Sequence, residues 1–112
     1  MEKYDKGFVK IHRKILDWEW YSDRCTRELF IYCILRANWR DGSWKGTDYK
    51  RGEFITTLPS LANSLGLSEK NVRTALRHLK KTGEISEIKT NKVRIIRVNK
   101  SDEYQNVAEH TE

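Results

Sequence analysis

The segment TLPSLANSLGLSEKNVRTALRHLKKTG, residues 57–83, decides the fold because it contains two helical patterns separated by a short turn. In the first pattern, Thr57 has a side chain that can cap a helix, and Pro59 fits the first turn, where its missing amide costs little. Leucine and alanine recur at helical spacing on one face, and Gly66 can adopt the left-handed conformation that ends a helix. We therefore predict a short helix from Leu58 to about Leu65.

The second pattern begins at Ser68, a helix-capping residue, and continues to Gly83, the expected stop. Its apolar residues form one narrow helical stripe, made of Val72, Ala75, Leu76 and Leu79. The opposite side carries Lys70, Arg73, Arg77 and Lys81, with Thr74 at its edge. One face of this helix is thus expected to pack into a core while the other presents cations.

Runs of β-forming residues lie on both sides of the helical pair. Residues 54–57 precede it, and residues 85–89 and 93–98 follow it. The polar turn 90–92 joins the last two runs into a basic hairpin, and Asn91 is its best candidate for a positive φ angle. The order of strand, helix, three-residue turn, helix and basic hairpin is that of a winged helix-turn-helix.

Four residue types also match the general helix-turn-helix signature. Ala62 is small where the two helices cross, Gly66 permits the sharp turn, and Leu67 with Val72 fills the angle between the helices. We predict a mainly α fold with a small β-sheet, a winged helix-turn-helix domain over residues 1–100. Residues 101–112 are expected to form a polar acidic tail or the start of a linker.

Two further helices are expected before this segment. A short one covers residues 12–17, and a longer one begins at Ser22 or Asp23 and ends near Trp39. The middle of the longer helix has almost no polar side, so both of its faces need cover. Either the first helix and the following hairpin bury it within the monomer, or it forms a homodimer contact.

Length and composition exclude several classes of protein. The chain has 112 residues, which suits one domain with one core. Its longest apolar run, residues 30–35, is too short to cross a bilayer, and its first residues lack the apolar stretch of a secretion signal. We expect a cytoplasmic protein without membrane association. Cys25 and Cys33 have neither a redox nor a metal-ligand spacing, so they are expected to be ordinary buried thiols, and no metal or cofactor is predicted.

Basic residues are concentrated in one third of the chain. Residues 68–100 contain ten Lys or Arg and three Glu, a net charge of +7 in a chain of net charge +6. Such a segment is either a solvated charged face or a surface for a polyanion, chiefly nucleic acid. In duplex DNA the major groove admits one helix, whose first turns lie nearest the bases. The candidate DNA-binding residues are Lys70, Asn71, Arg73, Thr74, Arg77, Lys80, Lys81, Lys89, Lys92 and Arg94.

These candidates have different expected roles. Arg73 suits bidentate contact with guanine and Asn71 with adenine, whereas Arg77, Lys80 and Lys81 suit phosphates. The basic residues of the hairpin suit a neighbouring backbone or the minor groove.

Three stretches carry a resemblance to one family: GFVKIHRKILDWEW (7–20), KRGEFITTLPSLANSLGLSEKNVRTALRHLKKTGEI (50–85) and TNKVRIIRVNKSDEYQ (90–105). Together they resemble the N-terminal winged-helix domain of DnaD-like and phage replisome-organiser proteins. The resemblance implies a DNA replication initiation protein whose winged-helix domain self-associates. It also implies contact with other replication proteins through a second, C-terminal domain that this sequence does not contain.

The sequence also bears on other classes of function. The three histidines lie in different predicted elements, and no Gly-rich phosphate loop, HExxH pattern or nucleophile elbow is present, so catalysis is not expected. The alternatives are a protein–protein interaction module with little DNA binding and a winged-helix transcriptional regulator. The four tryptophans, Trp18, Trp20, Trp39 and Trp44, are expected in the core rather than in a stacking site for single-stranded nucleic acid.

Overall fold

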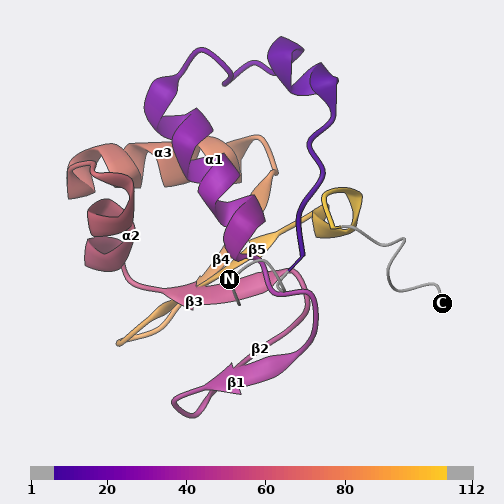
Figure 1. Cartoon of the computed structure of the whole chain (residues 1–112). Helices are drawn as coiled ribbons and strands as arrows, with labels where there is room; N and C mark the ends of the chain where they lie inside the picture. The colour runs from indigo at the N-terminus through magenta and orange to yellow at the C-terminus, as the bar shows by residue number, and fades with distance from the viewer. Residues whose placement is uncertain (1–6, 106–112) are drawn as a thin grey trace, which may run out of the picture.

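The computed structural model describes residues 7–105 as an α+β fold, with three α-helices, two 3-10 helices and two small antiparallel sheets in this range (Figure 1). The elements in chain order are η2 (Arg13–Asp17), α1 (Arg24–Arg36), β1 (Gly42–Trp44), β2 (Thr47–Tyr49), β3 (Glu53–Thr56), α2 (Leu58–Leu65), α3 (Glu69–Lys81), β4 (Ile85–Lys89), β5 (Arg94–Val98) and η3 (Ser101–Glu103). None of the helices in this part of the chain is long and apolar enough to span a membrane.

The α2–α3 pair forms with the predicted caps. The Thr57 hydroxyl accepts a hydrogen bond from the Ser60 amide at 3.2 Å, and the Ser68 hydroxyl accepts one from the Asn71 amide at 3.1 Å. Gly66 ends α2 with φ +68°, the left-handed conformation that its sequence position predicts. The turn between the helices therefore consists of residues 66–68, as expected.

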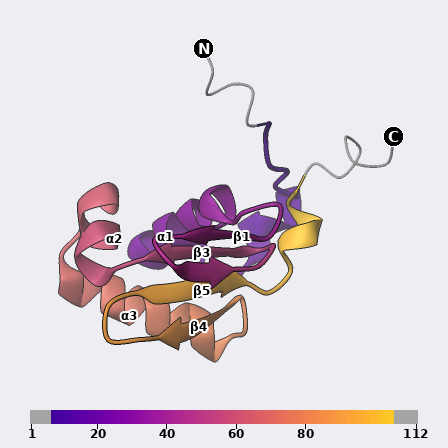
Figure 2. The same ribbon diagram turned by 90° about the horizontal axis from the view of Figure 1, so that it is seen from below.

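The larger sheet has the strand order β3-β5-β4 (Figure 2). Phe54 lies opposite Ile96, and Ile85 lies opposite Val98, and all four side chains are buried. The helices cover one face of this sheet, so strands and helices share one core. The other core residues are Leu29, Phe30, Cys33, Ile34, Ala37, Leu58, Leu61, Ala62, Val72, Ala75, Leu76 and Leu79.

The turn of the β4–β5 hairpin differs from the prediction. Among residues 7–105, the one non-glycine residue with a positive φ angle is Lys45, so Asn91 does not adopt the expected conformation. Thr90 closes the turn instead. Its hydroxyl accepts hydrogen bonds from the amides of Lys92 and Val93, so the loop does not depend on a left-handed residue.

Helix α1 begins as predicted but is shorter. Asp23 caps it by accepting a hydrogen bond from the Thr26 amide, and the helix ends at Arg36 rather than near Trp39. It stops there because the Asn38 amide and side chain both donate to the Glu53 carbonyl, which draws the chain toward β3.

The apolar middle of α1 is covered within the monomer. Phe30, Cys33 and Ile34 are buried, while Leu35 is 62% exposed. Helix α3 packs along α1, and the Trp18 and Tyr104 rings contact Phe30. The monomer thus supplies the cover, and α3 contributes to it together with β5 of the hairpin.

Residues 42–49 form a hairpin that was not predicted from the sequence. Lys45 and Gly46 both have positive φ, +48° and +81°, which is the pattern of a two-residue turn between antiparallel strands. The Tyr49 ring lies over Gly42, since a Cβ atom there would come within 2.4 Å of the tyrosine hydroxyl. A glycine is therefore required for the close approach.

The tryptophans divide into two pairs. Trp18 and Trp20 pack against the core and donate hydrogen bonds to Glu84 and Thr82, both at 2.9 Å. Trp39 and Trp44 are 42% and 50% exposed, so the expectation that all four lie in the core is wrong for these two. Both lie after the end of α1, Trp39 in the connection and Trp44 in β1.

The two ends of the described chain lie together. Val9 and Gln105 form an antiparallel bridge, and the Ser101 and Gln105 side chains are buried. Residues 101–105, expected to begin a tail, thus pack on the domain, whereas residues 106–112 of the expected tail lie outside the described residues. Upstream, the short predicted helix is the 3-10 helix η2, and the His12 side chain caps it.

Of the two thiols, only Cys33 is fully buried. Burial raises its pKa to about 12, although the nearby Arg36 charge acts in the opposite direction. Cys25 is half-buried, so the expectation of two buried thiols holds for Cys33 alone.

Candidate nucleic-acid interface

Helix α3 separates apolar and cationic side chains onto opposite faces. Its buried face consists of Val72, Ala75, Leu76 and Leu79. The predicted residues Lys70, Asn71, Arg73, Arg77 and Lys81 are all exposed, and Thr74 is half-buried at the edge. The fold therefore brings these six predicted residues onto the solvent side of one helix.

One carboxylate lies on this face. Glu69 stands in the first turn of α3, and its Oε1 atom is 3.8 Å from the Arg73 guanidinium. Both side chains are about half exposed, so solvent screens the pair and leaves Arg73 available to another anion. The position of Glu69 is typical of a helix start, where a negative charge interacts favourably with the helix dipole.

The β4–β5 hairpin supplies two exposed cations, Lys89 at the end of β4 and Lys92 in the loop. Neither is within salt-bridge distance of an acidic group in the described part of the chain. The tip of the hairpin therefore presents its positive charge to solvent.

Lys80 and Arg94, two predicted DNA contacts, both bind the carboxylate of Glu87. Lys80 donates to Glu87 at 2.7 Å, and Arg94 donates to the other oxygen of the same group at 2.5 Å. Only 4% of the Glu87 side chain and 15% of the Arg94 side chain are exposed. Arg94 is thus turned toward α3 and has little exposed surface for the predicted DNA contact.

Lys80, Glu87 and Arg94 form a triad of charged side chains, which sets the pKa of Glu87. Burial is the largest single influence and raises the pKa of Glu87, but the hydrogen bonds and charges of Lys80 and Arg94 together outweigh it. The pKa of Glu87 is consequently below its ordinary value, and the carboxylate is ionised at neutral pH. The triad fixes the hairpin against the last turn of α3. Sequence reasoning missed it, although Glu87 is the one acidic residue of β4.

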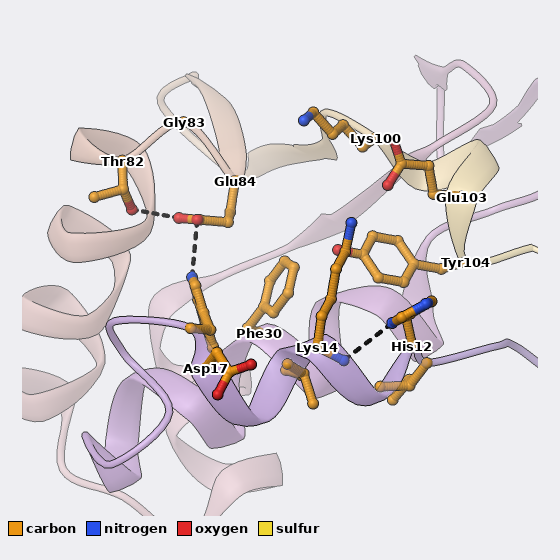
Figure 3. Close-up of a pocket in the computed structure, with 13 residues that line it drawn as sticks. His12, Lys14, Asp17, Phe30, Thr82, Gly83, Glu84, Lys100, Glu103 and Tyr104 are labelled. Carbon is orange, nitrogen blue, oxygen red and sulfur yellow. Dashed lines mark hydrogen bonds between the residues drawn. The ribbon is translucent and has the colours of Figure 1, made fainter.

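A cavity of about 450 Å³ lies on another side of the molecule, between η2 and the chain around η3 (Figure 3). The Phe30 and Tyr104 rings meet edge to face in it, with centroids 5.8 Å apart. Lys14 and Lys100 line it together with Glu84 and Glu103, so its charges are mixed. Burial, assisted by the two glutamates, raises the pKa of Tyr104, which keeps the phenol neutral. The cavity suits an apolar side chain better than an anion.

No group of three or more potential metal ligands occurs within residues 7–105. Comparison of the chain with protein-family models, curated proteins and solved structures found no match.

Proposed function

We propose that this chain is a winged helix-turn-helix domain that binds double-stranded DNA without catalysing a reaction, and that it self-associates. The main support for this proposal is the exposed cationic face of α3. The apolar stripe on the opposite side of the helix is fully buried, so the cations are held toward solvent. The order β3, α2, turn, α3, β4, β5 supports the winged-helix assignment, with β4–β5 as the wing. A role in DNA replication initiation, beside further replication proteins, rests on the resemblance of the sequence alone.

In this proposal α3 enters the major groove and the wing lies along the adjacent backbone. Arg73 and Asn71, near the start of α3, read bases, while Arg77 and Lys81 contact phosphates. Arg94 acts indirectly, because with Glu87 it holds the wing in position. The cations that meet DNA directly are Lys70, Arg73, Arg77, Lys81, Lys89 and Lys92.

Fluorescence anisotropy with a labelled duplex at several salt concentrations tests this proposal. If six cations each neutralise a phosphate, the slope of log affinity against log salt is about −5. The slope of the double variant Arg73→Ala, Arg77→Ala is expected to be shallower by about 2. A charge-matched control, Lys10→Ala with Arg13→Ala, removes two exposed cations outside α3 and the wing. Equal losses in the two double variants, or unchanged affinity in the first, would reject the proposed reading helix.

Self-association is proposed through the N-terminal segment rather than through α1. Phe8 and Leu16 are each 61% exposed, Ile11 is 42% exposed, and Ile11 also lines the cavity beside η2. Such a group of exposed apolar residues is typical of an interaction surface. Light scattering after size exclusion tests it: wild type is expected to elute as a dimer or larger, and Leu16→Asp as a monomer. A concentration-independent wild-type monomer would remove this part of the proposal.

The same apolar segment favours the second candidate, a protein–protein module whose basic face only improves solubility. Salt separates the two candidates, because phosphate contacts weaken steeply as salt rises whereas an apolar interface does not. An absence of salt-dependent duplex binding, with self-association retained, would favour the module.

A further inference from the structure

A second cavity, of about 380 Å³, opens between the β1–β2 hairpin, the end of α1 and the start of α2. We call it the hairpin groove. Its lining residues are Arg36, Asn38, Trp44, Tyr49, Ile55, Thr56, Thr57, Ser60 and Val93. They include one cation and no carboxylate, in contrast to the mixed charges of the cavity beside η2. The groove therefore favours an anionic ligand over a cationic one.

The aromatic side chains of the groove come from one face of the hairpin. Trp44 pairs with Thr47, and Gly42 pairs with Tyr49, so Trp44 and Tyr49 project to the same side. Asp48, the acidic residue of these two strands, projects to the opposite side together with its partner Ser43. The hairpin thus turns two aromatic rings toward the groove and its carboxylate away from it.

Cations already lie against the rings around this groove. The Lys45 ammonium is 4.7 Å from the centre of the half-exposed Trp44 ring. The Arg36 guanidinium lies 5.0 Å from the centre of the Phe54 ring and donates to the Tyr32 hydroxyl at 2.8 Å. Arg36 is therefore held at the groove, and Lys45 stands beside the exposed indole.

We propose that the hairpin groove binds single-stranded nucleic acid, with an unpaired base stacked on Trp44 and the adjoining phosphates near Lys45 and Arg36. Proteins that bind single strands without sequence preference combine these two components, an aromatic platform and a cationic track for the backbone. Hydroxyl groups of Thr57 and Ser60 line the same groove and can donate to a phosphate or a base edge.

The charge of the groove distinguishes this ligand from a peptide. An uncharged or basic peptide gains nothing from Arg36 and Lys45, whereas each nucleotide supplies both a ring and a negative charge. The groove also differs from the α3 face in residues and substrate, so the proposal does not depend on duplex binding. Val93, next to the wing loop, lines the groove, which places the single strand beside the proposed duplex site.

A labelled oligothymidylate, titrated by fluorescence anisotropy at fixed salt, tests the proposal. Loss of a base-stacking ring weakens binding by roughly fivefold to a hundredfold, which is the effect expected for Trp44→Ala. Trp44→Phe keeps an aromatic face and is expected to retain most of the affinity. Trp39→Ala is the matched control, because it removes a second exposed indole that does not line the groove. Circular dichroism verifies that each variant is folded.

A second probe separates stacking from charge. An abasic oligomer with the same number of phosphates is expected to bind wild type as weakly as oligothymidylate binds Trp44→Ala. Three results would each overturn the proposal. They are an affinity of Trp44→Ala equal to that of wild type, equal binding of the two oligomers by wild type, and no binding of oligothymidylate. The Arg73→Ala, Arg77→Ala variant keeps single-strand binding if the two sites are separate, so failure of the duplex proposal is recognised independently.

Discussion

Replacing Glu87 by glutamine tests how strongly the triad holds the wing to α3. The variant keeps the size of the side chain but removes the charge shared by Lys80 and Arg94. Arg94 is 15% exposed, so its bond to the carboxylate is comparable to a buried charge-assisted hydrogen bond, about 2 kcal/mol. Lys80 is 44% exposed and screened, so its bond adds less than about 1 kcal/mol. We expect Glu87→Gln to lower the free energy of unfolding by about 2–3 kcal/mol at pH 7.

The effect has a defined dependence on pH. The pKa of Glu87 is lower in the folded than in the unfolded chain, so its stabilisation is fully present above the unfolded pKa. It is lost as the pH falls through the folded pKa, where wild type also carries an uncharged group at this position. The stability difference between wild type and Glu87→Gln is therefore expected to shrink as the pH falls below about 4.5, the ordinary glutamate value.

Urea unfolding followed by circular dichroism, at a series of pH values from 7 to about 3, measures this difference. Glu69→Gln is the control, because Glu69 faces an arginine at 3.8 Å with half of its side chain exposed, and its loss is expected to cost below about 0.5 kcal/mol. A loss in Glu87→Gln no larger than in Glu69→Gln would refute the reasoning. A difference from wild type that stays constant across the pH range would refute its electrostatic origin.

Three further predictions concern the fold. Cys33 is fully buried and its pKa is raised, so we expect it to react with a thiol reagent only after unfolding, whereas Cys25 reacts in the native state. Equal reaction rates of the two thiols in the native protein would contradict this prediction. Gly66→Ala is expected to cost about 1 kcal/mol in urea unfolding, because φ there is +68° and the space around it is open, and an unchanged midpoint would argue against backbone strain. Lys45→Asn is expected to stabilise the β1–β2 turn by about 0.5 kcal/mol, since asparagine tolerates positive φ more readily, and a lower melting temperature would count against that turn geometry.

Local signals predicted the part of the fold that depends on neighbouring residues. Thr57, Gly66 and Ser68 act within one helical turn of their own positions, so their caps and the turn between α2 and α3 are readable from the sequence. The exposed cationic face of α3 follows from the same short-range periodicity.

Features set by distant contacts were not predictable in this way. The end of α1 depends on the contact between Asn38 and Glu53, and Trp39, the residue after Asn38, lies 42% exposed at the surface. The orientation of Arg94 depends likewise on Glu87 lying between the hairpin and α3.

A signal for the β1–β2 hairpin was present, because Lys45-Gly46 between β-forming residues fits a two-residue turn.

The bridge between Val9 and Gln105 places the two ends of the described part of the chain side by side. Two fusion partners attached there start side by side, and a short peptide suffices to join the ends into a closed ring. A circular permutant closed in this way and opened between Lys45 and Gly46 keeps α2, α3 and the wing in one uninterrupted piece. The new chain ends of this permutant lie in the turn between β1 and β2, so the hairpin that carries Trp44 loses the covalent link between its strands.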